Sequence, residues 1–530
     1  MHSCLLVSEI FELIAHFSNE DGLTPSTVAS LSRTCRSFHE IAEDVLWRRL
    51  NGLTALMHCF GHGVCGHSAG PYYFTKYPEG HDWQKFNRRA RRVQSLALGQ
   101  SFDAEAELQA LQVLDLCRPD PKVAILPNLR ELRWCDLRET SLRYVSLFVH
   151  PGLVNFNALV IGNPRVLSET IAFLSVAAPG LRSLRISPGA PEHEHPGIVG
   201  ALGRMLTSSP CLAELSVRAP VCAATLPLLA HHPRLEVLSV RVASSLDSSV
   251  FRATADIPTF RSLRRLTALA ESVDDVVPLL NMVESPNFSS LVVHLKIQPT
   301  TTSLHHLFRV ISRHRSFQSL NILVTPSNKH RSLVTPLQTS QQYVLTPSSF
   351  RYLLGLSKLT HLIITQIPTL SDDQLVNNMA SAWPCLERLS LGTAARLENP
   401  GLSLESIRGL VCACPRLGEL GLAFNPSHKL EKKLAVTSSI RGNGYQQTSS
   451  AADRFGRIHR RPASALPPSR LQVFDIGCSS VGDVKKFAQF VVAVFPDARI
   501  CDAHGPTSRL GPMRVIQGEV TKARSVPRWA

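Results

Sequence analysis

Residues 181–186 read Leu-Arg-Ser-Leu-Arg-Ile, and this pattern, Leu-x-x-Leu-x-Leu, recurs along most of the 530-residue chain. Alternate residues of a strand point to the same side, so the last two apolar positions face inward and the residue between them faces outward. Successive copies in the middle of the chain begin 23 to 31 residues apart, a period typical of solenoids. Good copies begin at Leu129, Leu181, Leu212, Leu235, Leu263, Phe317, Leu359, Leu386, Leu417 and Leu471, and weaker ones at Val93, Leu111, Phe156 and Phe288.

The segments between the copies predict helices that cover one side of the strands. Between Ile186 and Leu212, large apolar residues recur at helical spacing, and Pro210 ends the segment. One strand and one covering helix per repeat give an α/β solenoid. We expect a solenoid of degenerate repeats over residues 91–500 and a C-terminal tail over residues 501–530.

Two insertions interrupt this period, at residues 324–346 and 425–468. The first is rich in Ser, Thr and Pro, and the stretch from Asn425 to Arg470 holds nine basic and two acidic residues, a net charge of +7. So much charge with few large apolar residues predicts a disordered loop. Two other interpretations remain open, a nuclear-import or recognition patch at Arg457-x-x-Arg460-Arg461 and a translated intron.

The N-terminal fifty residues predict a separate helical unit. Ser8 can cap a helix in which Ile10, Leu13, Ile14 and Phe17 form one apolar stripe, and a polar turn follows at residues 18–22. Thr24-Pro25 begins a second helix, and a third runs towards Trp47. A unit of this size buries too little apolar surface for secure independent stability. It therefore needs a partner, either the rest of the chain or another protein.

This unit resembles the F-box in three ordered motifs. They read Leu6-Val7-Ser8-Glu9-Ile10, Arg33-Thr34-Cys35-Arg36-Ser37-Phe38 and Leu46-Trp47-Arg48-Arg49-Leu50. The resemblance implies an F-box over residues 1–52, followed by a linker and a first amphipathic helix over residues 53–90. It also implies a Skp-type adaptor as partner, with the adaptor-binding residues Leu5, Leu6, Ile10, Leu13, Ile14, Leu31, Phe38 and Trp47.

Further phrases resemble the large F-box family of mushroom-forming (basidiomycete) fungi. They are Asp82-Trp83 leading to Ala90-Arg91-Arg92-Val93, Ala382-Trp383-Pro384-x-Leu386, and Val492 to Phe495-Pro496. Together with the strand period, which is that of a leucine-rich repeat, they imply a three-helix F-box followed by a leucine-rich-repeat-like α/β solenoid. The implied function is that of a non-catalytic substrate-recognition subunit in a cullin-RING (SCF-type) ubiquitin ligase. The alternatives are a repeat scaffold that assembles no ligase and a nucleic-acid-binding repeat protein.

Composition indicates a globular intracellular protein. Hydrophobic residues make up 44% and charged residues 18% of the chain. No apolar run reaches the length of a membrane span, and no secretory signal is evident, so we expect a cytoplasmic or nuclear location. Thirteen scattered cysteines, such as those at 211, 222, 385 and 412, are expected to be small buried hydrophobes in a reducing compartment.

The formal charge of +15 is unevenly distributed. Residues 1–60 hold four basic and seven acidic groups, a net charge of −3, so the remainder of the chain carries +18. The densest basic run, Arg88-Arg89-x-Arg91-Arg92, suggests a nucleic-acid patch. Trp83 and Phe86 share a helical face beside it, however, so the favoured interpretation is the solvated side of an amphipathic helix.

Candidate catalytic and metal sites are sparse. His58, Cys59, His62, Cys65 and His67 have the chemistry of zinc ligands but not their close pairing, so no metal is expected. No phosphate-binding loop or nucleophile motif is evident, and neither an enzymatic activity nor a cofactor is predicted.

Outward positions of the strands suggest a target-binding surface. They hold Arg133, Arg185, Arg218, Arg241 and Arg265, which would suit an acidic or phosphorylated segment of a target protein through paired guanidinium hydrogen bonds. The equally weighted alternative is that these arginines only keep exposed strands soluble.

Overall fold

The structure is a computed structural model, and it divides the chain into two compact units, Met1–Arg241 and Val242–Ala530. It describes residues 8–20, 25–61, 64–67, 72–99, 104–136, 138–160, 163–188, 196–222, 225–242, 259–325, 341–392, 401–422, 424, 470–477, 479, 484–501 and 510–525.

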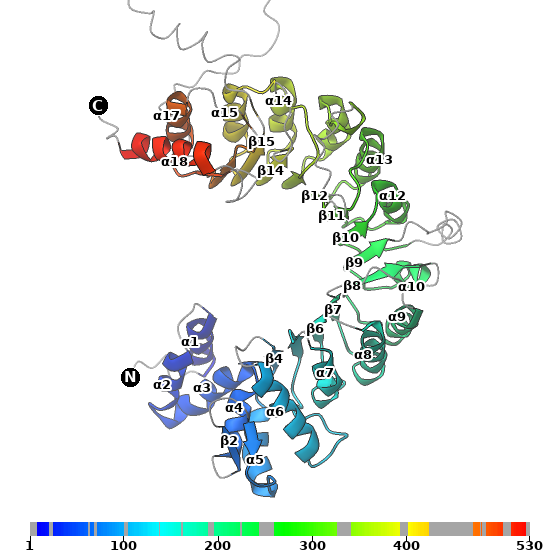
Figure 1. Ribbon diagram of the computed structural model, residues 1–530, viewed down its shortest axis with the longest axis vertical. Helices are drawn as coiled ribbons and strands as arrows, with labels where there is room; N and C mark the ends of the chain where they lie inside the picture. The colour runs from blue at the N-terminus through cyan, green and yellow to red at the C-terminus, as the bar shows by residue number, and fades with distance from the viewer. Residues whose placement is uncertain are drawn as a thin grey trace, which may run out of the picture. The chain divides into compact units, whose positions relative to one another are not determined.

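The first unit begins with three helices and continues as a parallel sheet with helices on one side (Figure 1). Its large-sheet strands follow the order β1-β4-β5-β6-β7-β8-β9. The helices are α1 (Ser8–Glu20), α2 (Pro25–Ser32), α3 (Arg36–Arg48), α4 (Thr54–Met57), η2 (His58–Phe60), α5 (Gly80–Ala90), α6 (Ala104–Cys117), α7 (Glu139–Leu142), η3 (Arg143–Leu147), α8 (Pro164–Ala177), α9 (Pro196–Ser208) and α10 (Leu226–Ala230). The strands are β1 (Arg49–Asn51), β2 (Cys65–His67), β3 (Tyr72–Phe74), β4 (Ser95–Leu98), β5 (Glu131–Trp134), β6 (Asn155–Val160), β7 (Ser183–Pro188), β8 (Glu214–Val221) and β9 (Val237–Val242).

The second unit repeats the same plan, with parallel strands in sequence order from β10 to β17. Its strands are β10 (Arg265–Ala270), β11 (Ser290–Leu295), β12 (Ser319–Val324), β13 (His361–Ile364), β14 (Arg388–Leu391), β15 (Glu419–Leu422), β16 (Val473–Asp475) and β17 (Arg499–Cys501). Its helices are α12 (Val273–Asn281), α13 (Thr301–Ile311), η5 (Gln341–Tyr343), η6 (Pro347–Gly355), α14 (Asp373–Ala382), α15 (Leu404–Ala413), α17 (Val484–Val494) and α18 (Leu510–Ser525). The predicted α/β solenoid is thereby confirmed.

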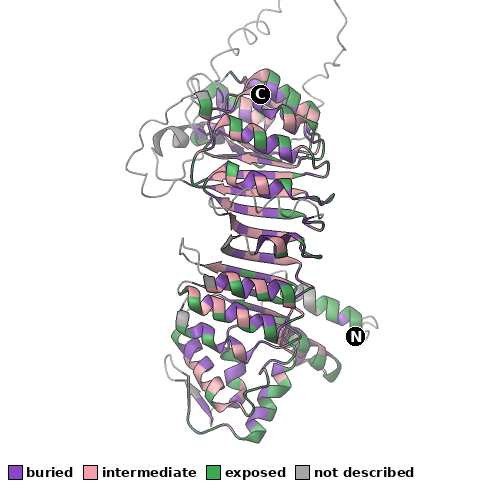
Figure 2. Ribbon diagram, turned by 90° about the vertical axis from the view of Figure 1, so that its right-hand side faces the viewer, coloured by how far each residue is buried: buried purple, intermediate pink, exposed green. Residues whose placement is uncertain are grey.

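The repeated leucines build the core between strands and helices. Strands such as β11 and β12 alternate strictly between buried and half-buried residues, as Figure 2 shows along the chain. The second leucine position is in register from strand to strand, so Leu291, Leu320 and Leu362 form one buried row. The Leu-x-x-Leu-x-Leu pattern predicts this, because it places these leucines on the side of the sheet that the helices cover.

Buried side chains also tie each turn to the preceding one. Trp383 Nε1 donates a hydrogen bond to the carbonyl oxygen of Leu353 at 3.1 Å, and Cys414 Sγ donates to the carbonyl oxygen of Trp383 at 3.4 Å. In the first unit, His232 Nε2 lies 3.1 Å from the carbonyl oxygen of Ser209. These bonds satisfy carbonyl groups that the turns would otherwise bury without partners.

Several sequence predictions are corrected here. The weak copy at Leu111 is wrong, because that residue lies inside α6. The copy assigned to Phe156 begins three residues earlier, at Leu153, since Phe156 aligns with Leu132 in the second position. The predicted polar turn at residues 18–22 starts too early, because α1 continues to Glu20.

The predicted linker and tail contain regular elements. Residues 53–90 hold a short helix, the paired strands β2 and β3, and α5, whose Trp83 and Phe86 pack against Phe60. Helix α18 lies in the segment predicted as a tail. Most of the insertions at 324–346 and 425–468 lies outside the described residues.

Candidate functional site

Helices α1, α2 and α3 share a small aromatic core. Phe11 of α1 is 2% exposed and stacks on Phe38 of α3, with ring centroids 4.0 Å apart and an interplanar angle of 10°. Val28, Ala42 and Val45 complete the buried cluster. Phe11 was missed in the sequence because it lies off the apolar stripe that the helical spacing selects. A helix with apolar residues on two faces gives no spacing signal for which face is buried.

Three residues of the predicted apolar stripe of α1 instead face outward, and the side chain of the fourth, Phe17, lies outside the described residues. Ile10 is 39% exposed, Leu13 is 58% exposed and Ile14 is 40% exposed, and they recur at i, i+3 and i+4 on one side of the helix. Large apolar side chains gathered on one exposed face mark a surface that another molecule covers. We call these three residues the α1 apolar face.

The other predicted adaptor-binding residues occupy different environments. Phe38 belongs to the buried core, and Leu31 packs half-buried against it. Trp47 is half-buried, and the Arg89 guanidinium lies over its ring, 5.4 Å from the centroid. Leu5 and Leu6 lie outside the described residues. Within the described part of the predicted set, only the α1 apolar face is largely open to a partner.

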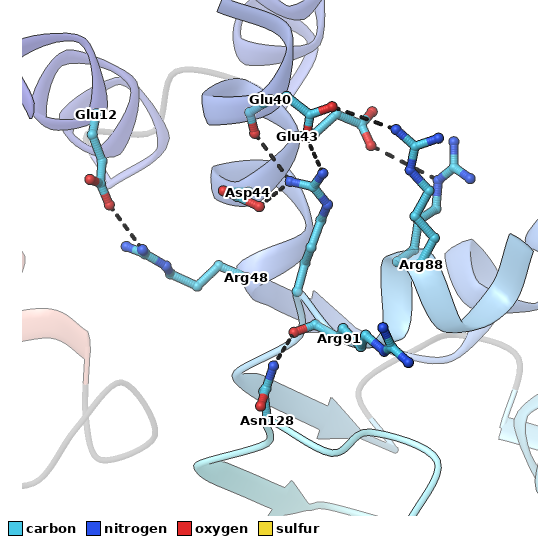
Figure 3. A network of polar contacts seen from close by, with 10 residues as sticks. Glu12, Glu40, Glu43, Asp44, Arg48, Arg88, Arg91 and Asn128 are labelled. Carbon is cyan, nitrogen blue, oxygen red and sulfur yellow. Dashed lines mark hydrogen bonds and ion pairs between the residues drawn. The ribbon is translucent and has the colours of Figure 1, made fainter. Parts of the chain in front are cut away.

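Arginines from α5 and the turn after it bind the acidic side of α3 (Figure 3). Arg88 pairs with Glu40 at 3.5 Å, and Arg92 pairs with both Glu40 and Asp44. Arg89 lies 4.0 Å from Glu43. We call these ion pairs the α3–α5 clamp. The sequence predicted that the basic run is only the solvated side of a helix. Its guanidinium groups instead form ion pairs that connect the N-terminal helices to the rest of the first unit.

Ionisation states follow from this clamp. The hydrogen bond from Arg92 is the main cause that lowers the pKa of Glu40, and the positive charge of Arg92 adds to it. Burial alone would lower the pKa of Arg92, but hydrogen bonds and charges from Glu40 and Asp44 outweigh burial and raise it. Both groups are thus held in their charged forms around neutral pH.

A separate ion pair connects α1 to α3. Arg48 donates to Glu12 Oε1 at 3.0 Å. Glu12 lies between Phe11, which is buried, and Leu13, which is exposed. The ion pair therefore connects α1 to α3 at the boundary between the buried side and the exposed side of α1.

The strand-face arginines do not form one row. Arg133 and Arg185 align through Asn157 in the first unit, and each is already paired, with Glu131 and Glu214 respectively, at 2.7 Å. Arg241 is half-buried on β9, and Arg265 is exposed at the start of β10. Arg218 lies in β8, but its side chain is outside the described residues.

Two members of the histidine and cysteine cluster, His62 and the side chain of His67, lie outside the described residues. Burial is the main cause that raises the pKa of Cys59, to about 11, and burial also raises the pKa of Cys65, so both are neutral thiols. No three metal-ligating side chains come together among the described residues, although His62 is not among them. The prediction of buried thiols elsewhere is wrong for Cys412, which is exposed, and Cys211, Cys222 and Cys385 are only half-buried.

Within the described ranges, no helix is both long and apolar enough to cross a membrane.

Comparison with known proteins gives a family match and several matches to solved structures. A chain of the crystal structure of the Rad7 and Elc1 complex in yeast aligns at 15% identity over 74% of this chain and 92% of that chain, with a TM-score of 0.34. No curated protein gives a significant match. The family model described as F-box-like matches residues 7–52, which comprise the aromatic core, the α1 apolar face and the acidic side of α3. The chain thus begins with an F-box-like domain and continues as an α/β solenoid.

Proposed function

We propose that this protein is the substrate-recognition subunit of a cullin-RING (SCF-type) ubiquitin ligase. The F-box-like domain would bind a Skp-type adaptor, and through it the cullin and RING subunits, while the leucine-rich-repeat-like solenoid would hold a target protein. We further propose a cytoplasmic or nuclear location and a fungal F-box kinship, as the sequence resemblance implies.

The observation that carries this proposal is the α1 apolar face within the F-box-like domain. The core residues Phe11 and Phe38 are buried, so the domain is already packed within itself, yet Ile10 and Leu13 remain open. An adaptor that covered these side chains would remove apolar surface from water, the main driving force of association.

The proposed role requires no catalytic residue in this chain. A target held beside a ubiquitin-charged enzyme meets the activated group at a high effective concentration, which accelerates transfer by placement alone. The α3–α5 clamp supports such a role, because it connects the F-box-like domain to the rest of the first unit.

The test is binding of the full chain to a purified Skp-type adaptor, with Ile10→Asp/Leu13→Asp as the variant. The exposed fractions of the α1 apolar face add up to somewhat more than one whole side chain, so its burial contributes about 2–4 kcal/mol. The double substitution removes Ile10 and Leu13, whose exposed fractions add up to about one whole side chain or about 1.5–3 kcal/mol, so it should weaken binding at least about tenfold, with a further loss from the desolvated charges.

Val176→Asp is the matched control, since Val176 is 82% exposed on α8, outside the domain. This variant should bind the adaptor like the original protein. Equal adaptor binding by the Ile10→Asp/Leu13→Asp variant would refute the proposal. Recovery of the cullin with the adaptor separates a ligase subunit from a repeat scaffold that binds the adaptor alone.

A further inference from the structure

The outward side of β10 to β13 differs in chemistry from that of the first unit. Two rows of outward residues run across these strands in register: Thr267, Val292, Asn321 and Ile363 in one, and Leu269, His294 and Leu323 in the other. None of these seven positions holds Lys, Arg, Asp or Glu. The matching row of the first unit reads Arg133, Asn157, Arg185 and Ser216.

Four large apolar side chains therefore gather where an exposed sheet face would normally be polar. Leu269, Val292, Leu323 and Ile363 lie on four neighbouring strands and are half-buried, although none of the helices described in the unit covers their side of the sheet (Figure 1). We call these four residues the β10–β13 apolar face. Half-buried apolar side chains on the open side of a sheet, here interleaved with Thr267, His294 and Asn321, favour contact with another molecule.

Asn321 lies at the centre of this face and has an unmet bonding requirement. Its neighbours in register are Val292 on β11 and Ile363 on β13. Its Oδ1 is buried and accepts no hydrogen bond from any described residue. A buried carbonyl-type oxygen without a donor is costly, and a bound segment can donate to it only if the Asn321 side chain turns outward.

One end of the apolar face carries a positive charge. One position before the buried leucine row, the residues in register are Arg265, Ser290, Ser319, His361 and Arg388. Arg388 is already paired with Glu419, whereas Arg265 is exposed on the strand that also carries Leu269. Charge complementarity therefore favours an acidic side chain next to the apolar ones in any segment bound here.

We infer that the β10–β13 apolar face binds an extended segment of a target protein that carries two apolar side chains and an adjacent Asp or Glu. The apolar side chains would cover Leu269, Val292, Leu323 and Ile363, and the carboxylate would pair with Arg265. This inference deepens the proposed function and rests on it for the view that the bound segment belongs to a ligase target.

The test uses the full chain and fluorescein-labelled decapeptide pools, read by fluorescence polarisation. One pool fixes two Glu beside two Leu at i and i+2, in both orders, with the other positions degenerate. Matched pools replace Glu by Lys, or Leu by Ser. We expect the Glu–Leu pool to bind at least tenfold more tightly than either matched pool.

Three variants locate the binding surface. Leu323→Ser and Ile363→Ser should each weaken the Glu–Leu pool at least tenfold. Arg265→Glu, at an exposed position that leaves the core unchanged, should reverse the preference in favour of the Lys–Leu pool. Arg133→Glu, the matched exposed substitution in the first unit, should change neither. Circular dichroism melting curves establish that each variant is folded.

Three results would overturn the inference. They are equal binding of all pools, loss of binding only in Arg133→Glu, and Leu323→Ser altering the oligomeric state of the chain without any peptide binding, which would identify a surface for a second copy. Adaptor binding, measured on the same samples, separates the two proposals. Failure of adaptor binding in the original chain refutes the proposed function, whereas failure of peptide binding alone refutes this inference.

Discussion

Phe11→Ala should unfold helices α1, α2 and α3 without unfolding the solenoid. The side chain is 2% exposed and stacks on Phe38 in a core of five buried residues. Removing a buried phenylalanine ring costs about 3–5 kcal/mol, which includes the cavity left behind. A single small core supplies about the same amount, roughly 3–5 kcal/mol, so the substitution removes most of what holds α1 to α3.

Hydrogen exchange followed by mass spectrometry measures this effect segment by segment. A loss of about 3–5 kcal/mol corresponds to exchange roughly 150- to 5,000-fold faster for amides protected by the opening of these helices. Peptides from α1, α2 and α3 should show it, while peptides from β11 and β12 should exchange as before. The adaptor should also bind more weakly, although Phe11 is buried and does not contact a partner.

Phe11→Leu is the matched control, because leucine keeps most of the apolar volume and loses only the aromatic stacking. It should retain most of the protection and most of the adaptor binding. The reasoning is refuted if Phe11→Ala leaves the exchange of α3 unchanged, since the stacked pair would then contribute nothing to the packing of the domain. Exchange that rises equally throughout the solenoid would also refute it, because the domain would then not be a separate folding unit.

Two further predictions concern the solenoid. Burial lowers the pKa of His232, and burial together with the charge of Arg313 lowers the pKa of His314. As the pH falls below the ordinary histidine value of 6.5, these two histidines are therefore protonated in the unfolded chain before they are protonated in the folded one. Stability should therefore decrease from pH 7.5 to pH 5.5 in urea unfolding curves, and less steeply in His232→Gln; a stability that rises on acidification would contradict this. Gly99 and Gly61 both have a φ of +78°, but a Cβ on Gly99 would lie 2.2 Å from the backbone nitrogen of Asp136, whereas one on Gly61 meets nothing within 4 Å. Gly61→Ala should cost about 1–2 kcal/mol and Gly99→Ala clearly more, so equal melting temperatures of the two variants would contradict the close approach.

The repeat architecture could be predicted because its signal is periodic and local. Each strand carries its own leucines, and Pro384 or Pro210 marks where a helix ends, so a correct interpretation of one repeat transfers to the next. The pattern fails where a helix imitates it. Leu111, Leu114 and Leu116 match the strand spacing, yet in α6 Leu114 is buried and Leu116 is 81% exposed.

The functional surfaces could be predicted only in part, because they depend on neighbours far apart in sequence. Ile10 and Leu13 were identified as partner-binding from the F-box resemblance, and they are exposed. The partners of Arg92 could not be found, since Glu40 and Asp44 are 52 and 48 residues away. The apolar positions Val292 and Ile363 gave no signal either, because only strand register brings them to either side of Asn321.

The α3–α5 clamp also limits which F-box could replace the one in this protein in a chimaera. Glu40, Glu43 and Asp44 contribute to the negative charge of the N-terminal sixty residues, and Arg88, Arg89 and Arg92 contribute to the positive charge of the remainder. An F-box from another protein, grafted here without that acidic side, would leave a dense cluster of like charges facing it. The two segments therefore form a matched pair, and a chimaera that keeps the junction intact has to carry α3 and α5 together.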